Sequence, residues 1–373
     1  MRKKPLSIPL SVYIHWRTAI AAALLASLCA SQAVAGQAVA AVDQNGNGAA
    51  SDNDFRIHEE GDTLPLKPTR LLKWDEREGT WVSLDVAPDG KTIVFELLGD
   101  LYTMPIAGGE ARCIVCGLPF DSQPVYSPDG AELAFVSDRD GNENLWISNA
   151  DGSSPRQIST MEDNSVFISP EWAPDGKSIY ISRYKPDMNA FELWRYSASG
   201  ADHEPLEQVT QAKRSPDTPK EFRSNALGAA VSPDGRYLYY ETKTGLGFDD
   251  DVNFPLWHIV RRDLKTGEEQ AFISAEGSAF RPRVSPDGKL LTYAERYQGK
   301  TALRVRNLVT DEDRLLAYPV QRDDQEGIGS RDLLPRYAFT PDSRSLVTNY
   351  GGKIYRIDVA TGKQSEVPFV AHV

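Results

Sequence analysis

The stretch YSPDGAELAFVSDRDGNENLWI, residues 126–147, predicts short β-strands joined by two turns. Pro128 restricts φ to about −65° at the first corner of a turn, Asp129 can accept hydrogen bonds from the turn backbone, and Gly130 can adopt a φ that other residues avoid. Apolar side chains then recur at every second position from Leu133, which is the period of a β-strand. We therefore expect a hairpin, a polar turn and a third strand.

The polar turn alternates oxygen-bearing side chains at Asp138, Asp140, Asn142 and Asn144, as the start of a calcium loop does. A calcium loop also needs a distal bidentate carboxylate, whereas Asn144 is followed at once by the next strand. The corresponding turns elsewhere in the chain do not keep these oxygens. We therefore interpret the segment as a hairpin turn and predict no metal site.

The Pro-Asp turn phrase occurs six times, which is the dominant pattern of the sequence. Its prolines lie 40, 46, 59, 53 and 55 residues apart, at Pro88, Pro128, Pro174, Pro233, Pro286 and Pro341. The sixth copy has Ser343 in place of glycine, which predicts a less regular turn. Each phrase is followed by a third and a fourth strand segment, and four antiparallel strands repeated in this way are typical of a β-propeller blade. The sequence predicts an all-β fold, a six-bladed β-propeller over residues 69–373.

Two segments compete to complete the last blade. The isolated strand Thr69–Trp74 precedes the first phrase, and we expect this N-terminal strand to close the ring as the outer strand of blade six. Residues 365–373, SEVPFVAHV, are then a surplus strand. Either they displace the N-terminal strand, or the last residues are a junction to a further domain.

The first 35 residues have the pattern of a secretory signal peptide, with four basic residues, an apolar run and the small-residue end Ala33-Val34-Ala35. Residues 36–68 have no period and predict a flexible linker. Cleavage takes away four of the 41 basic residues and none of the 53 acidic ones, which leaves a net charge of −16. We expect a periplasmic or secreted protein without membrane insertion after cleavage, and such acidity argues against nucleic acid as a partner.

The phrases SPDG, SDRDGNENLW and ADGSSPRQIS, in register with the other copies, resemble the TolB-like β-propeller family over residues 69–370. The stretch Glu78–Ala111 is similar to the start of large exported bacterial proteins in which such a propeller precedes an amidohydrolase domain. That resemblance implies a propeller portion whose hydrolase domain is missing from this chain or encoded separately. The family also implies binding of a protein or peptide in the cell envelope.

The chain lacks the residue patterns of a hydrolase. Beyond the expected signal peptide its histidines are His58, His203, His258 and His372, and no two are spaced as a metal-binding pair. There is no Gly-x-Ser-x-Gly and no phosphate-binding glycine loop. We predict no catalytic residues, no metal and no cofactor.

The remaining cysteines are Cys113 and Cys116. Their flanks predict a strand, in which residues three apart point to opposite faces, so we expect two inert or incidentally oxidised thiols. A local disulfide remains the alternative, since an exported protein would permit it.

The links that precede the inner strands all emerge on one face around the central channel, and this channel face usually carries the ligands of a propeller. We predict ligand-binding residues there, and an anion site where the arginines converge. The set is Asp121, Gln123, Arg223, Arg281, Arg283 and Arg336. The alternative is that each arginine bonds a carboxylate or carbonyl of a neighbouring blade.

These observations support two functions. The first is an exported, non-catalytic propeller that binds a protein or peptide at its channel face. The second is the substrate-gating propeller half of an amidohydrolase whose catalytic domain lies outside this chain. A lyase or lactonase propeller enzyme is a weaker third.

Overall fold

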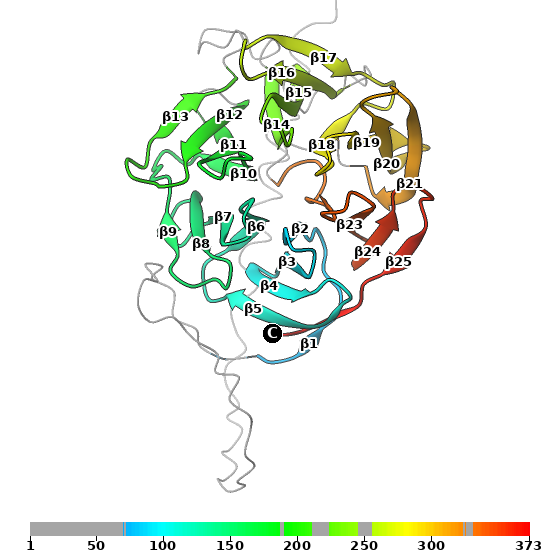
Figure 1. Ribbon diagram of the computed structural model, residues 1–373. Coiled ribbons are helices and arrows are strands. Elements are labelled where there is room, and N and C mark those ends of the chain that lie inside the picture. The colour runs from blue at the N-terminus through cyan, green and yellow to red at the C-terminus, as the bar shows by residue number, and fades with distance from the viewer. Residues whose placement is uncertain are drawn as a thin grey trace, which may run out of the picture. The chain divides into compact units, whose positions relative to one another are not determined.

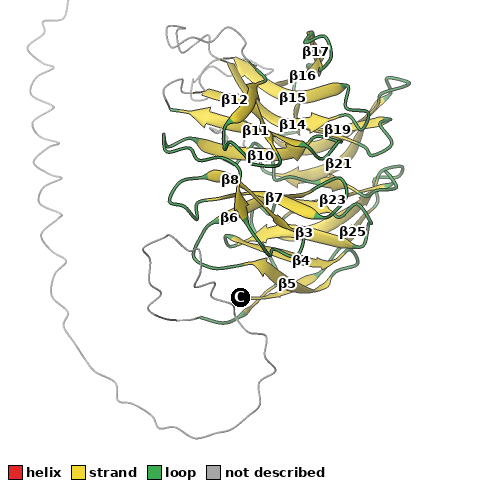
Figure 2. Ribbon diagram, turned by 60° about the vertical axis from the view of Figure 1, so that its left-hand side comes forward, coloured by secondary structure: helices red, strands yellow, loops and turns green. Residues whose placement is uncertain are grey.

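The computed structural model describes residues 70, 72–186, 190–210, 224–244, 256–323, 325 and 331–373. Their regular elements are all β-strands (Figure 2), and no helix among them is long and apolar enough to cross a membrane. The predicted signal peptide, the linker and Arg223 lie outside the described residues.

Six antiparallel blades follow one another around a ring in chain order, as the sequence predicts (Figure 1). Blade one consists of β2 (Leu84–Val86), β3 (Thr92–Leu97), β4 (Asp100–Pro105) and β5 (Gly109–Val115), and blade two of β6 (Asp121–Tyr126), β7 (Glu132–Ser137), β8 (Asn144–Asn149) and β9 (Arg156–Gln157). Blade three consists of β10 (Val166–Trp172), β11 (Ser178–Lys185), β12 (Ala190–Ser197) and β13 (Pro205–Gln208), and blade four of β14 (Ser224–Val231), β15 (Tyr237–Thr244), β16 (His258–Asp263) and β17 (Glu269–Ile273). Blade five consists of β18 (Phe280–Val284), β19 (Leu290–Tyr297), β20 (Lys300–Asn307) and β21 (Asp313–Gln321), and blade six of β22 (Ala338–Phe339), β23 (Ser345–Tyr350), β24 (Lys353–Asp358) and β25 (Gln364–Glu366).

Each repeated phrase forms the turn between the first and second strands of its blade. In blade two, Asp129 Oδ1 accepts hydrogen bonds from the Ser127 hydroxyl at 2.6 Å and from the Ala131 amide at 3.0 Å. Gly130 has φ 73°, and a Cβ there would lie 3.3 Å from Pro88 in the turn of blade one. The phrase recurs because it both closes its own hairpin and packs against the turn of the preceding blade.

The sixth turn is as well bonded as the others, contrary to the expectation of a less regular one. Ser343 adopts a left-handed φ of 61°, and Asp342 Oδ1 still accepts the Arg344 amide at 3.1 Å. The Ser343 hydroxyl oxygen also accepts the Asp287 amide at 3.1 Å from the turn of blade five. This contact with the neighbouring blade offsets the unfavourable backbone conformation.

Apolar side chains fill the spaces between neighbouring blades. Leu84 and Phe95 of blade one share a buried cluster with Val347 and Ile354 of blade six. Between blades two and three, the indole of Trp172 is buried and donates a hydrogen bond to the Val125 carbonyl at 3.1 Å. These interfaces hold the first strands in fixed positions around the channel.

The ring closes at blade one and not, as expected, at blade six. Blade six has its own outer strand β25, so no position remains there for an N-terminal strand. After Pro368 the chain crosses to blade one, where β26 (Phe369–His372) pairs in parallel with β5. The segment predicted as the N-terminal strand, Thr69–Trp74, is not a strand at its described residues, and the short strand that follows it, β1 (Asp75–Glu76), pairs with the outer side of β26.

Packing and hydrogen bonding explain this arrangement. Phe369 is buried, with its ring centroid 5.2 Å from that of Phe95, and the Gly109 amide donates to the Pro368 carbonyl at 2.8 Å. The surplus strand of the sequence is therefore the element that closes the ring, and the N-terminal strand covers it.

His372 joins the three strands of this seam. One ring nitrogen, Nδ1, lies 2.8 Å from Asp75 on β1, and the other, Nε2, lies 2.7 Å from Glu110 on β5. These hydrogen bonds, that of Asp75 first, raise the pKa of His372. Only the protonated ring can donate to both carboxylates at once.

We predict that this seam weakens as pH rises. Because the folded-state pKa is raised, the stabilising contribution is complete below the unfolded value of about 6.5 and is lost as pH rises through the folded value. Between about pH 6 and about pH 9 the melting temperature of the wild type should fall more than that of His372→Asn. Thermal melts at both pH values check this, and parallel changes in the two proteins would contradict it.

The cysteine prediction is corrected by the structure. Cys113 and Cys116 form a disulfide, with their Cα atoms 6.2 Å apart. Cys113 lies in β5, but this strand ends at Val115, so the backbone has already turned at Cys116. The argument from opposite strand faces fails because the second cysteine is no longer in the strand.

Candidate binding site at the channel face

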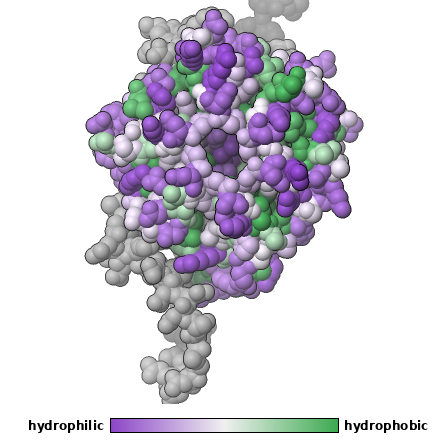
Figure 3. Space-filling model, in the orientation of Figure 1, coloured by the Kyte–Doolittle hydropathy of each residue, from purple (hydrophilic) through white to green (hydrophobic). Residues whose placement is uncertain are grey.

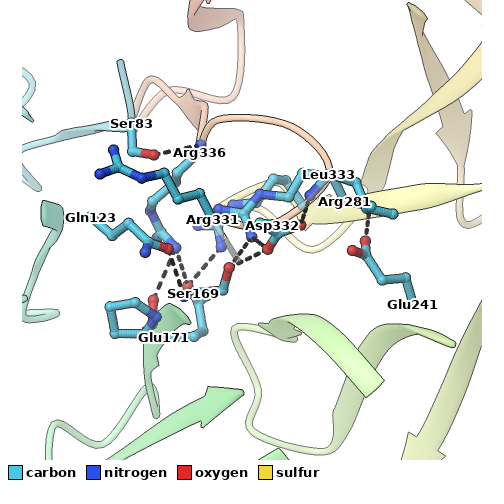
Figure 4. Close-up of polar contacts among 12 residues, drawn as sticks. Ser83, Gln123, Ser169, Glu171, Glu241, Arg281, Arg331, Asp332, Leu333 and Arg336 are labelled. Atoms are coloured by element: carbon cyan, nitrogen blue, oxygen red, sulfur yellow. Dashed lines mark hydrogen bonds and ion pairs between the residues drawn. The ribbon is translucent and has the colours of Figure 1, made fainter. Parts of the chain in front are cut away.

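The first strands of blades two to five share an irregularity that positions side chains at the axis. Each has a β-bulge, and the residue five positions before the phrase proline has a left-handed φ in all four blades. These residues are Gln123, Ser169, Gly228 and Arg281, with φ of 55°, 56°, 62° and 54°. Ser83 and Arg336 are the equivalent positions in blades one and six. A bulge redirects one side chain of a strand, and here it aims three of them at one another (Figure 4).

Asp332 lies at the centre of this group (Figure 4). It belongs to the connection between β21 and β22, and its buried carboxylate pairs with Arg281 and accepts the Ser169 hydroxyl. Arg281 also donates to Ser169 Oγ at 2.6 Å, and the Ser169 amide donates to Gln123 Oε1 at 2.7 Å. The cluster joins blades two, three and five through a segment that leads into blade six.

Glu171 forms a second buried contact beside the first. Its Oε2 accepts Arg283 Nη1 at 2.6 Å and Arg336 Nη1 at 2.8 Å. Burial alone would raise the pKa of Glu171, but the two guanidinium groups outweigh it and hold the pKa below its ordinary value. Arg336 Nε also lies 3.7 Å from Asp85 Oδ1.

The structure thus brings together four of the predicted site residues, Gln123, Arg281, Arg283 and Arg336. Each of the three arginines has a carboxylate partner from another part of the ring, which is the alternative that the sequence left open. Asp121, the remaining predicted residue that is described, has a different partner and accepts Arg139 Nη2 at 2.7 Å. The polar centre of the ring is visible as a hydrophilic hollow in Figure 3.

In the turn that resembles a calcium loop, side-chain oxygens accept hydrogen bonds from groups of the protein itself. Asp138 Oδ1 accepts the Phe120 amide at 2.7 Å, and Asp140 Oδ2 accepts the Asn144 amide group at 3.0 Å. In the part of the chain that the structure describes, no group of three or more potential metal ligands comes together.

A pocket of about 410 Å³ opens on the channel face between the start of blade one and the connections beside it. Its walls include Trp81, Leu98, Phe120, Arg331 and Glu96. The Trp81 indole donates to the Arg331 carbonyl at 3.2 Å. The Arg331 guanidinium carbon lies 4.3 Å from the centroid of the Phe120 ring.

Two bulky residues of the pocket have unfavourable backbone conformations. Trp81 and Leu98 adopt φ of 59° and 56°, in the left-handed region that large side chains rarely occupy. Leu98 is also 64% exposed, and Phe120 is 36% exposed. Strained, exposed apolar groups in one concave place favour binding over a purely structural role.

Two carboxyl groups lie at this pocket or next to it, the buried Glu96 in its wall and the half-buried Asp100 beside the lining residue Gly99. Glu96 accepts the Gln123 amide at 2.6 Å, and burial raises its pKa to about 7. Asp100 accepts the Gly117 amide at 3.0 Å, and burial raises its pKa to about 7 as well. Asp100 holds a backbone amide of the link between blades one and two, and Glu96 holds one of the strand β6 that follows this link, so we assign both groups a positioning role.

Trp81, Leu98 and Arg331 were absent from the predicted site. Arg331 belongs to the link before the first strand of blade six, and Trp81 to the segment before that of blade one. The sequence could have indicated Arg331 and Trp81, because the segments that precede the first strands of the blades all meet on the channel face. The left-handed conformations had no signal in the sequence.

Comparison with known proteins agrees with this architecture. Residues 73–245 match the family model described as TolB beta propeller domain. The chain carries a TolB-like β-propeller.

Solved structures share the TolB-like propeller fold. TolB from Acinetobacter baumannii superposes with a TM-score of 0.55 at 15% identity, over 78% of this chain and 65% of that one. A putative TolB from Agrobacterium tumefaciens gives 0.53 at 16%, over 80% and 91%. The tricorn protease gives 0.56 at 16%, over 78% of this chain and 26% of the protease. This chain therefore spans less than two thirds of the Acinetobacter protein, and at these identities the likeness shows the fold.

Proposed function

We propose that this TolB-like propeller is an exported binding module, without catalytic residues of its own, that binds a protein or peptide ligand at its channel face. The observation that carries the proposal is the pocket around Trp81, Phe120 and Arg331. Tryptophan is among the residue types that contribute most to binding energy at protein interfaces. The neighbouring Leu98 extends the apolar area beyond the pocket.

The buried arginines support this function indirectly. Arg281 and Arg336 are both almost inaccessible to solvent, so a ligand would have to break their ion pairs in order to use them. We assign them the task of fixing the segment 331–337, from which Arg331 reaches the pocket. The ligand then enters the pocket that Arg331, Trp81 and Phe120 line, with its main contacts on the two aromatic side chains.

The sequence supports an export route for this module. The signal-type N-terminus would place the propeller in the periplasm or outside the cell, where the ligand would be a protein or peptide of the cell envelope. The surface of such an acidic protein would not attract nucleic acid.

The double variant Trp81→Ala/Phe120→Ala should lose its ligand. Loss of two aromatic contacts at the centre of an interface costs about 2 kcal/mol or more each, so capture from an envelope extract should fall at least tenfold. Affinity capture with quantitative mass spectrometry measures this. Val309→Ala is the matched control, because Val309 is 76% exposed and lies in the turn between β20 and β21, away from the channel face. Unchanged capture by the double variant would refute the proposed site.

A second candidate function is the propeller half of an amidohydrolase. The likeness to the tricorn protease supports this candidate, because the match covers only 26% of that enzyme and a propeller of this fold is therefore only a part of it. Translation of the DNA downstream of Val373 tests it: a reading frame with a His-x-His metal motif would support it, and its absence in all frames would oppose it.

A further inference from the structure

The channel-face pocket has a negative electrostatic character. Glu76 and Glu78 line it together with Glu96, whose raised pKa of about 7 leaves it partly protonated near neutral pH, and Arg331 is the one basic residue among its described lining residues. Glu76 accepts the amides of Arg77 and Glu78 and the indole N–H of Trp74, and these bonds lower its pKa. Glu78 is exposed at the rim. A group entering the pocket therefore meets more negative than positive charge.

Arg331 indicates which chemistry the aromatic wall accepts. Its guanidinium carbon is 4.3 Å from the Phe120 centroid, well within the range of a cation–π contact. Among the described residues no carboxylate forms a salt bridge with Arg331, and the residue is exposed. Its favourable charge interactions are with the buried Glu96 and the half-buried Glu143, at longer range. The side chain is held by one aromatic face and a diffuse negative field, so it can be displaced at small cost.

We propose that this pocket recognises a cationic side chain, arginine or lysine, of the protein ligand, and that Arg331 occupies the Phe120 face until the ligand replaces it. This inference rests on the proposed function and specifies its ligand chemistry. The incoming cation stacks on Phe120 within the negative field of Glu76 and Glu78, while the apolar stem of the same side chain packs against Trp81 and Leu98. The opposite arrangement, in which Arg331 binds a carboxylate of the ligand, would place that anion beside the glutamates.

The test uses three short peptides on the full-length mature protein. Acetyl-Gly-Arg-Gly-amide is the cationic probe, the same peptide with citrulline keeps the shape without the charge, and the peptide with glutamate is the anionic probe. Saturation-transfer NMR titrations measure their affinities. We expect the arginine peptide to bind about fivefold more tightly than the citrulline peptide, with the difference reduced at high ionic strength.

Two variants separate the roles of the pocket residues. Glu78→Gln should weaken the arginine peptide about threefold, whereas Arg331→Gln should strengthen it because the aromatic face becomes free. Glu132→Gln, on the far side of blade two from the channel face, is the matched control and should change nothing. Tighter binding of the glutamate peptide, together with its loss in Arg331→Gln, would overturn the inference in favour of anion recognition.

The experiments distinguish a failure of the cation inference from a failure of the proposed binding site. If no peptide binds, or all three bind alike, and Trp81→Ala/Phe120→Ala still loses capture of its partner, the site stands and the cation inference is wrong. If the double variant keeps its partner, the proposed site itself has failed.

Discussion

Arg281→Met should lower the free energy of unfolding of this propeller by about 3–5 kcal/mol. The substitution keeps most of the side-chain volume but removes the charge that pairs with Asp332, whose side chain is fully buried. Asp332 would then keep the Ser169 hydroxyl and the Leu333 amide as donors. It also contacts the side chain of Glu241, a second buried carboxyl group whose pKa is raised by burial first and then by Asp332. Leaving a buried carboxylate without its cation lowers the free energy of unfolding far more than the intact ion pair raises it. Urea unfolding monitored by tryptophan fluorescence measures the loss.

Two further variants decide whether the effect has this cause. Arg236→Met breaks the ion pair with Asp263, in which the arginine side chain is 58% exposed, and should lower the free energy of unfolding much less than Arg281→Met does. The double variant Arg281→Met/Asp332→Leu removes both charges and should recover much of the stability that the single variant loses. A double variant no more stable than Arg281→Met would show that the loss comes from packing and not from the unpaired charge.

Glu171→Gln should also lower the free energy of unfolding by about 3–5 kcal/mol, because one carboxylate oxygen accepts hydrogen bonds from two buried arginines. The neutral amide leaves Arg283 without a carboxylate at hydrogen-bond distance among the described residues. Arg336 keeps the Pro170 carbonyl at 3.3 Å, and its remaining carboxylate is that of Asp85 at 3.7 Å. Glu132→Gln makes the same change at a partly exposed pair with Arg156 and should cost less than about 1 kcal/mol. Equal losses in these two variants would contradict the special role of Glu171.

The pH dependence of this effect has a definite sign. The pKa of Glu171 is lower in the folded protein than the ordinary value of about 4.5. Its stabilising contribution is therefore complete above about pH 4.5 and is lost as pH falls through the folded value. The difference in stability between the wild type and Glu171→Gln should be constant near neutral pH and narrow in acid, as urea titrations at several pH values would show.

The sequence predicts the blades well because their determinants are local. The Pro-Asp-Gly turn and the period-two strand after it act over about ten residues, so six copies predict six blades. Ring closure depends on pairing between β26 and β5, which lie more than 250 residues apart in the chain. The strand β25 is short, exposed and without apolar alternation, which explains why it was merged with β26 in one predicted strand.

The sequence predicts only part of the candidate site, because the contacts that complete the site join residues far apart in the chain. The arginine residues of the first strands are visible in the repeat, but their partners are not: Glu171 lies 112 positions from Arg283 and 165 from Arg336. Residue type alone cannot distinguish an arginine that awaits a ligand from one that already has a buried carboxylate. Trp81 and Leu98 owe their positions to left-handed backbone conformations, which the surrounding structure imposes.

The pairing of β26 with β5 also determines when this protein can be completed during synthesis. Blade one emerges first from the ribosome, yet the strand that seals its outer side, Phe369–His372, is translated after all six blades. Until then the nascent chain is an open arc in which the interface between blades one and six cannot form. Contacts across such a sequence distance form late and slowly. A chaperone that shields the exposed edge of β5 would therefore act on the nascent chain for nearly the whole time of its synthesis.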